Sequence, residues 1–353
     1  MLVATAGMWC YCIPTANFRP SEAETREIAA AYFGLPSPVA VSMEGHTIWS
    51  KNGVARGICD KYGQQLVALQ LAGDGWNTAH DSFKHALCQV LRDLRVEFDC
   101  EVFGLFSALI PQGPRRARLD DGSKRAAQKR QGMVPDFRIV AGSVAQRLGI
   151  HAASSFLAEL KFIHMHLGRA RYPNRVVGVG RHREAVRLRA AKIGPEMLAH
   201  ARQLDEEFGG HPVGQDGPVL QRLRSFGPVL PMVVGHFGEW NDELSHFVVA
   251  IGDDAAPRMA DLFGASSQRA AKASILFFAR RCLVWAGWLA NARLKLGRSA
   301  YVGPTWASAA ARRAEAARMD DQSDARCRDS AAHWTGLGVS QGPGAPRQAG
   351  VAG

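Results

Sequence analysis

The expected fold is decided by the stretch Ser155-Phe156-Leu157-Ala158-Glu159-Leu160-Lys161-Phe162-Ile163. This stretch predicts a strand in which Glu159 and Lys161, two residues apart, project from the same face. A second strand is predicted over residues 134–140, and Asp136 stands near its start. Asp136 joins Glu159 and Lys161 on one face if the two strands pair in a suitable register.

Further elements are predicted on both sides of these strands. Apolar residues at helical spacing predict a helix over residues 78–94, and alternating polar and apolar residues predict a strand over 97–102. Downstream, a basic helical region over 183–208 is expected to be split by Pro195, and an apolar run predicts a strand over 229–237. The order helix, three strands, helix, strand predicts an α/β fold with a mixed sheet.

The flanking segments predict additional helices around this core. Ser21 and Glu24 form a capping-box pattern for a helix that Gly34 ends, and a long amphipathic helix is predicted over 267–296. The predicted organisation is a tail over 1–20, a helix with an irregular linker over 21–75, the core over 76–252, a helical extension over 253–319 and a disordered tail over 320–353.

Composition narrows the class of protein. Of 353 residues, 47% are hydrophobic and 21% are charged, which is typical of a folded protein. The formal charge is +11 because 43 basic residues outnumber 32 acidic ones. That excess favours a polyanionic partner, with nucleic acid ahead of a membrane surface.

Two further features bear on the compartment. The seven cysteines are odd in number and irregular in spacing, which favours free thiols, and the N-terminus lacks the basic flank of a signal peptide. We therefore expect a nuclear or cytoplasmic protein that is not secreted. No membrane insertion is expected, because Arg280 and Arg281 interrupt the most apolar stretch at about 3 kcal/mol each in a bilayer.

The predicted face with Asp136, Glu159 and Lys161 suggests phosphodiester chemistry. Two carboxylates side by side are costly without a cation, and Mg²⁺ prefers a few carboxylates plus water and phosphate oxygens. Such a metal polarises a phosphodiester and lowers the pKa of a bound water, while a lysine orients that water. The alternative is that Asp136 caps a turn and Glu159 pairs with Lys161 on a solvated sheet face.

Pro135-Asp136 followed by Glu159-Leu160-Lys161, in this element order, resembles the PD-(D/E)XK nuclease superfamily over roughly residues 76–249. The resemblance implies an αβββαβ core, with Asp136 and Glu159 as ligands of Mg²⁺ or Mn²⁺ and Lys161 as the catalytic lysine. Many members add an acidic residue from the first helix or strand. Glu97 and Glu101 are the better candidates here, and their choice depends on register.

Two short motifs are similar to the restriction-like endonuclease region of eukaryotic retroelements, namely Cys59-Asp60-Lys61-Tyr62-Gly63 and His80-Asp81. In that family a zinc knuckle uses Cys and His, and an Arg-His-Asn-like triplet opens the core helix. Gln65 and Leu69 stand where a His and a Cys are expected, and Ala79 replaces the Arg. We expect a degenerate knuckle that has lost its metal, in a domain that is decaying or repurposed.

The expected partner is DNA. Lys129 and Arg130 in the loop before Pro135, together with Arg183 and Arg187 in the following helix, would contact the phosphate backbone. A solvated helix face is the alternative for these residues. His80 is a candidate substrate contact by the family resemblance, and paired cuts by such nucleases often need a homodimer.

Three functions remain open from the sequence. The first is a metal-dependent DNA endonuclease. The second is a catalytically inactive nucleic-acid-binding or interaction protein that keeps the nuclease fold. The third is a basic peripheral protein that places its long helix on anionic membranes.

Overall fold

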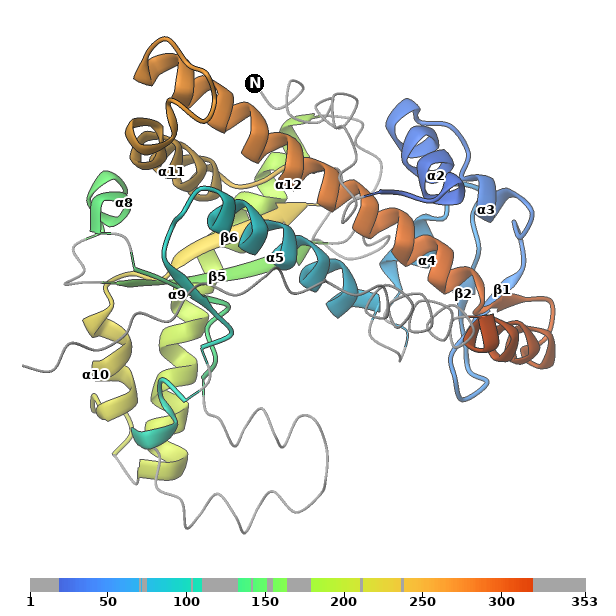
Figure 1. Cartoon of the computed structure of the whole chain (residues 1–353). Helices are drawn as coiled ribbons and strands as arrows, with labels where there is room; N and C mark the ends of the chain where they lie inside the picture. The colour runs from blue at the N-terminus through green and yellow to red at the C-terminus, as the bar shows by residue number, and fades with distance from the viewer. Residues whose placement is uncertain are drawn as a thin grey trace, which may run out of the picture.

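The computed structural model describes residues 19–319, except 70, 72–74, 103, 110–132, 141, 151–154, 164–178, 210–211 and 236–237. Its described part is mixed α/β, as predicted, with a four-stranded sheet and a smaller three-stranded sheet (Figure 1). The predicted disordered tail over 320–353 and nearly all of the tail over 1–20 lie outside the described residues.

The larger sheet has the strand order β3-β4-β5-β6. The β3–β4 and β4–β5 pairs are antiparallel, and the β5–β6 pair is parallel, so the sheet is mixed. A parallel pair needs a long crossover, which the helices between β5 and β6 supply. The strands are β3 (Phe98–Cys100), β4 (Phe137–Ile139), β5 (Phe156–Ile163) and β6 (Leu230–Gly235).

Helices cover both faces of this sheet (Figure 1). Phe156, Ala158 and Leu160 of β5 face a large apolar cluster with the helices of one face, whereas Leu157 and Ile163 face a second cluster on the other. The helices of the first face are α5 (Gly75–Asp93), α11 (Asp242–Met259) and α12 (Gln268–Ser299). The helices of the second face are α9 (Val179–Gly209) and α10 (Pro218–Ser225).

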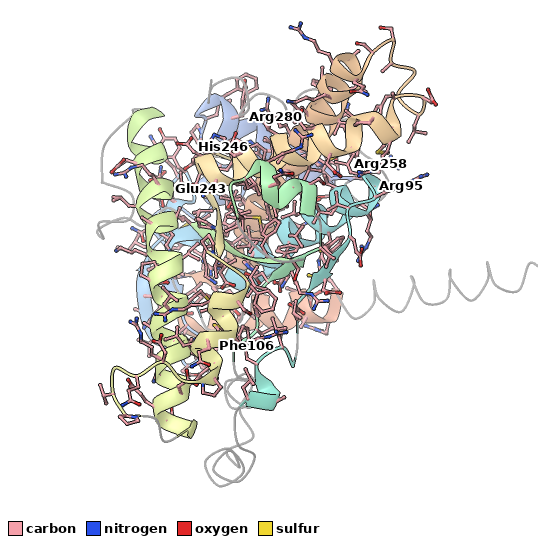
Figure 2. All side chains as sticks on the ribbon, turned by 90° about the vertical axis from the view of Figure 1, so that its left-hand side faces the viewer. Arg95, Phe106, Glu243, His246, Arg258 and Arg280 are labelled. Atoms are coloured by element: carbon pink, nitrogen blue, oxygen red, sulfur yellow. The ribbon has the colours of Figure 1, made fainter. Side chains whose placement is uncertain are left out.

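The chain segment after β3 closes the lower end of the second cluster. A short 3₁₀ turn over Ser107–Leu109 follows Phe106, which is fully buried among residues of α9 and α10 (Figure 2). On the first face, helix α8 (Gly142–Arg147) packs on α11.

Helix α9 corrects one prediction. Pro195 predicts a split at this point, yet the helix runs without a break from Val179 to Gly209. Proline removes one backbone hydrogen bond, but Ile193 and Met197, on either side of it, are both buried in the second cluster. Packing of the flanking turns therefore holds the helix together through the proline.

The predicted N-terminal helix is confirmed as α2 (Glu22–Phe33). The side chain of Ser21 accepts the amide of Glu24, the carboxylate of Glu24 accepts the amide of Ser21, and Gly34 ends the helix at φ +67°. Ile28 packs on Trp285 and Trp288 of α12. This contact ties the N-terminal segment to the long helix.

The small sheet joins distant parts of the chain. Strand β1 pairs with both β2 and β7, so that Thr47 lies opposite Gly303. Helix α12 runs from the core to this sheet (Figure 1). The remaining elements are α3 (Pro38–Val41), β1 (Thr47–Trp49), β2 (Ala55–Ile58), α4 (Gln64–Ala68) and β7 (Val302–Gly303).

The segment that resembles a zinc knuckle is organised by a carboxylate. Asp60 accepts the backbone amides of Tyr62, Gln64 and Gln65 at 2.7–3.2 Å, and Cys59 is buried beside it as a free thiol. From α12, Arg298 donates to the carbonyl groups of Leu66 and Val67 in α4 and of Leu69, which caps that helix. Protein groups thus hold this segment in place.

Among the described residues, α12 is the single helix that is long and apolar enough to cross a membrane. In its most apolar 18-residue window, 56% is buried inside the protein.

Helix α11 continues through residue 252, where the sequence suggests a boundary between core and extension.

Candidate active site

Asp136 and Glu159 meet where β4 begins. Because Phe137 pairs with Ala158 in the antiparallel register, Asp136 lies opposite Glu159. The backbone amide of Asp136 donates to Oε2 of Glu159 at 3.4 Å, and the amide of Leu160 donates to Oδ2 of Asp136 at 2.9 Å. The structure therefore brings together the two carboxylates that the sequence pattern indicates.

Lys161 completes this set of three. Its ammonium group forms an ion pair with Oε1 of Glu159. The side chain of Glu159 is 11% exposed and that of Lys161 is 37% exposed. The carboxylate is therefore buried, while the lysine side chain is partly accessible to solvent. The alternative holds in that Glu159 pairs with Lys161, but Glu159 is buried rather than solvated, and Asp136 accepts a hydrogen bond from the neighbouring strand.

His80, near the start of α5, lies against the carboxylate pair. Its Nε2 atom lies 3.5 Å from Oδ2 of Asp136 and 3.2 Å from the carbonyl oxygen of Leu160, while Nδ1 lies 2.9 Å from Oδ1 of Asp81. Burial lowers the pKa of His80, but the bonds to Asp136 and Asp81 outweigh it and raise that pKa above the ordinary value. In its protonated form the ring donates through Nδ1 to Asp81 and through Nε2 to the carbonyl of Leu160, and its charge faces Asp136.

Lys84 is a site residue that the sequence pattern does not single out. It lies one turn after His80 on α5, and its Nζ atom is 2.5 Å from Oε1 of Glu101, 3.4 Å from Oδ1 of Asp81 and 3.9 Å from Oδ1 of Asp136. Its side chain is 5% exposed. The signal in the sequence is its spacing from the candidate His80, because residues four apart on a helix share a face.

The structure distinguishes Glu101 from Glu97 as the further acidic residue near the site. The amide of Glu101 donates to the carbonyl of Asp136 at 2.9 Å, which places Glu101 beside the site. Glu97 is exposed at the opposite end of β3, where its carbonyl accepts the amide of Val140. Glu101 has φ +51°, a left-handed conformation that is uncommon outside glycine and that clusters at functional sites.

The pKa values of the two carboxylates are shifted in opposite directions. Burial favours the neutral form of Asp136, but the hydrogen bond and charge of His80, the charge of Lys161 and the amide of Leu160 together hold its pKa below the usual value. Burial and the negative charge of Asp136 raise the pKa of Glu159. A cation bound by the carboxylates of Asp136 and Glu159 would reduce the repulsion between their negative charges.

The donor set fits a hard divalent cation. Mg²⁺ and Mn²⁺ prefer carboxylate oxygens, and Mg²⁺ is commonly held by one or two carboxylates with water and phosphate oxygens. Asp136 and Glu159 supply two such groups, whereas Glu101 is engaged by Lys84. Within the described ranges, no group of three His, Cys, Asp or Glu side chains forms a metal cage.

The structure describes only some of the side chains that are candidates for DNA contact. Lys129 and Arg130 lie outside the described residues, as does the side chain of Arg183, whose backbone belongs to α9. Arg187 is exposed on α9 and forms two hydrogen bonds, at 2.6 and 2.7 Å, with the carboxylate of Glu184. Helix α9 covers the sheet face to which Leu157 and Ile163 point, the face that Glu159 and Lys161 share by strand alternation.

Comparison with known proteins adds no relative. No protein-family model, curated protein or solved structure matches the chain.

Proposed function

We propose that this chain is a metal-dependent endonuclease that hydrolyses DNA phosphodiester bonds and derives from a retroelement. The observation that carries the proposal is the β4–β5 register, which sets Asp136 opposite Glu159 with Lys161 bound to Glu159. The proposal is also supported by the mixed sheet and by the order α5, β3, β4, β5, α9, β6, into which the short helices α8 and α10 are inserted, since the PD-(D/E)XK resemblance implies that core order.

Each side chain has a distinct role in the proposed reaction. Asp136 and Glu159 would hold Mg²⁺ or Mn²⁺, which when bound polarises the phosphodiester and lowers the pKa of a water. The ammonium group of Lys161 would orient the attacking water and balance negative charge that develops on the phosphate. His80 would fix the carboxylate of Asp136 through its contact with Oδ2.

The net charge of +11 supports a polyanionic substrate. We assign backbone contacts to Lys129, Arg130, Arg183 and Arg187, and a substrate contact to His80 in addition to its contact with Asp136. Binding by such residues would weaken with salt because each neutralised phosphate releases counterions.

One observation favours a second candidate, a catalytically inactive DNA-binding protein. Lys84, Lys161 and protonated His80 already offset the negative charge of the carboxylates in the absence of a metal. A domain that no longer bound metal would be stable with this arrangement. The two candidates differ in whether a divalent cation produces cleavage.

The test is incubation of the purified chain with supercoiled plasmid in Mg²⁺, Mn²⁺ or chelator. Asp136→Ala and Lys161→Ala are compared with Glu97→Ala, a matched control because Glu97 is exposed at the far end of β3. The nuclease proposal expects metal-dependent nicking that only the control retains. Salt-sensitive plasmid binding without nicking by any variant would favour the inactive binder.

A further inference from the structure

The buried ammonium of Lys84 is shared by carboxylates from three parts of the fold. Asp81 lies on the same helix, Glu101 follows β3 and Asp136 precedes β4. Among these, the contact with Glu101 is the shortest, at 2.5 Å. Three carboxylates within 3.9 Å offset the cost of burying this positive charge.

A role in packing alone explains this arrangement poorly. A buried charge is costly, and an apolar residue of similar volume often serves stability as well or better. Lys84 also joins two of the carboxylates nearest the proposed reaction centre, Glu101 and Asp136. In sites with two metals, a second cation about 3.5–4 Å from the first binds such additional oxygens.

We propose that Lys84 is a fixed internal cation that stands in place of a second metal and limits the site to one divalent cation. The inference rests on the proposed nuclease function. In it, Lys84 is a positioning residue that keeps Glu101 away from the resident metal and steadies Asp136. The resident metal is then held by Asp136 and Glu159.

Three variants test this with Mn²⁺ as the probe, and electron paramagnetic resonance counts the bound ions. The wild-type chain is expected to bind one Mn²⁺. Lys84→Gln removes the charge and is expected to admit a second Mn²⁺, whereas Lys84→Arg keeps one. The double variant Lys84→Gln, Glu101→Gln removes both partners and is expected to return the count to one.

Glu101→Gln alone tests the same idea in a chain that keeps Lys84. Its Mn²⁺ affinity is expected to stay within about threefold of wild type, because Glu101 is not a ligand of the resident metal. A tenfold loss of affinity would overturn the inference, as would a count of one in a folded Lys84→Gln variant. Circular dichroism establishes that each variant is folded.

Plasmid nicking separates the two proposals. If the wild type nicks DNA and binds one Mn²⁺ but Lys84→Gln behaves identically, the inference fails and the nuclease function stands. If the wild type neither binds Mn²⁺ nor nicks DNA, the proposed function fails and the inference fails with it.

Discussion

The Nε2 atom of His80 lies 3.5 Å from Oδ2 of Asp136, although the two residues are 56 positions apart in the chain. The same oxygen accepts the amide of Leu160 at 2.9 Å. A helix and a neighbouring strand therefore hold this one carboxylate from two directions. The orientation of Asp136 is set before any substrate arrives.

The first prediction concerns His80 and pH. The pKa of His80 is raised in the folded chain, so its stabilisation is fully present below the unfolded value of 6.5 and is lost as pH rises through the folded value. His80→Gln should therefore destabilise the chain more at about pH 5.5 than at about pH 8.5, with a difference in unfolding free energy on the order of 1 kcal/mol.

Urea unfolding at the two pH values measures this difference. His246→Gln is the control because His246 is exposed on α11 (Figure 2). An equal loss of stability for His80→Gln at both pH values would contradict the account.

The second prediction concerns Glu159 in the absence of metal. Its pKa is raised, so the chain loses stability as pH rises from the unfolded value of 4.5 through the folded value. At neutral pH Glu159→Gln should therefore be as stable as wild type or more so, by on the order of 1 kcal/mol. Thermal melts in chelator measure this.

Addition of Mg²⁺ should make the wild type more stable than Glu159→Gln. A ligand that binds only the folded chain raises its stability, so the wild type should gain stability in millimolar Mg²⁺ and Glu159→Gln should not. Equal stabilisation of both chains would show that Glu159 does not bind the ion.

The third prediction concerns Arg298. Its Nη1 atom donates to the carbonyls of Leu66, Val67 and Leu69 at 2.7, 3.1 and 2.8 Å. Arg298→Met should cost about 3 kcal/mol of unfolding free energy, because buried carbonyls lose their donor. Arg293→Ala, which breaks an ion pair of an exposed arginine with Glu24, should cost less than about 1 kcal/mol.

Urea unfolding compares these two variants of α12. Similar losses for both would mean that Arg298 does not hold the C-terminal end of α4.

The fourth prediction concerns Cys59 and the degenerate zinc knuckle. Burial, with the charges of Asp60 and Glu44, raises the pKa of Cys59 to about 11. Only about one thiol in a thousand is then ionised near pH 8, and zinc needs the thiolate. Native Cys59 should react with iodoacetamide at least about 100-fold more slowly than in urea.

Peptide mass spectrometry follows the labelling of Cys59, and elemental analysis measures zinc. Stoichiometric zinc that is lost in Cys59→Ser would refute this prediction.

The sequence alone could predict the pair on β5 but not its surroundings. Glu159 and Lys161 project together because alternation in a strand is a local property. Their approach to Asp136 depends on register, which a shift of one residue would have reversed. The choice of Glu101 over Glu97 depends on the left-handed turn at Glu101, which no glycine marks.

Lys84 and α9 show the limits set by tertiary packing. A lysine on a helix normally faces solvent, and Lys84 is buried because Glu101 and Asp136 come to it from other elements. Pro195 predicts a break that the buried neighbours in α9 override. Likewise, the pairing of β1 with β7 joins residues more than 250 positions apart, which no local pattern reveals.

Calorimetric titration of Mg²⁺ into the wild-type chain and into Asp136→Asn measures directly whether Asp136 and Glu159 bind a metal ion. We expect one binding event in the wild type, with a dissociation constant at or below the millimolar range, and none in the variant. Absence of binding to the wild type, or equal binding to both chains, would contradict the assignment of Asp136 and Glu159 as a metal site.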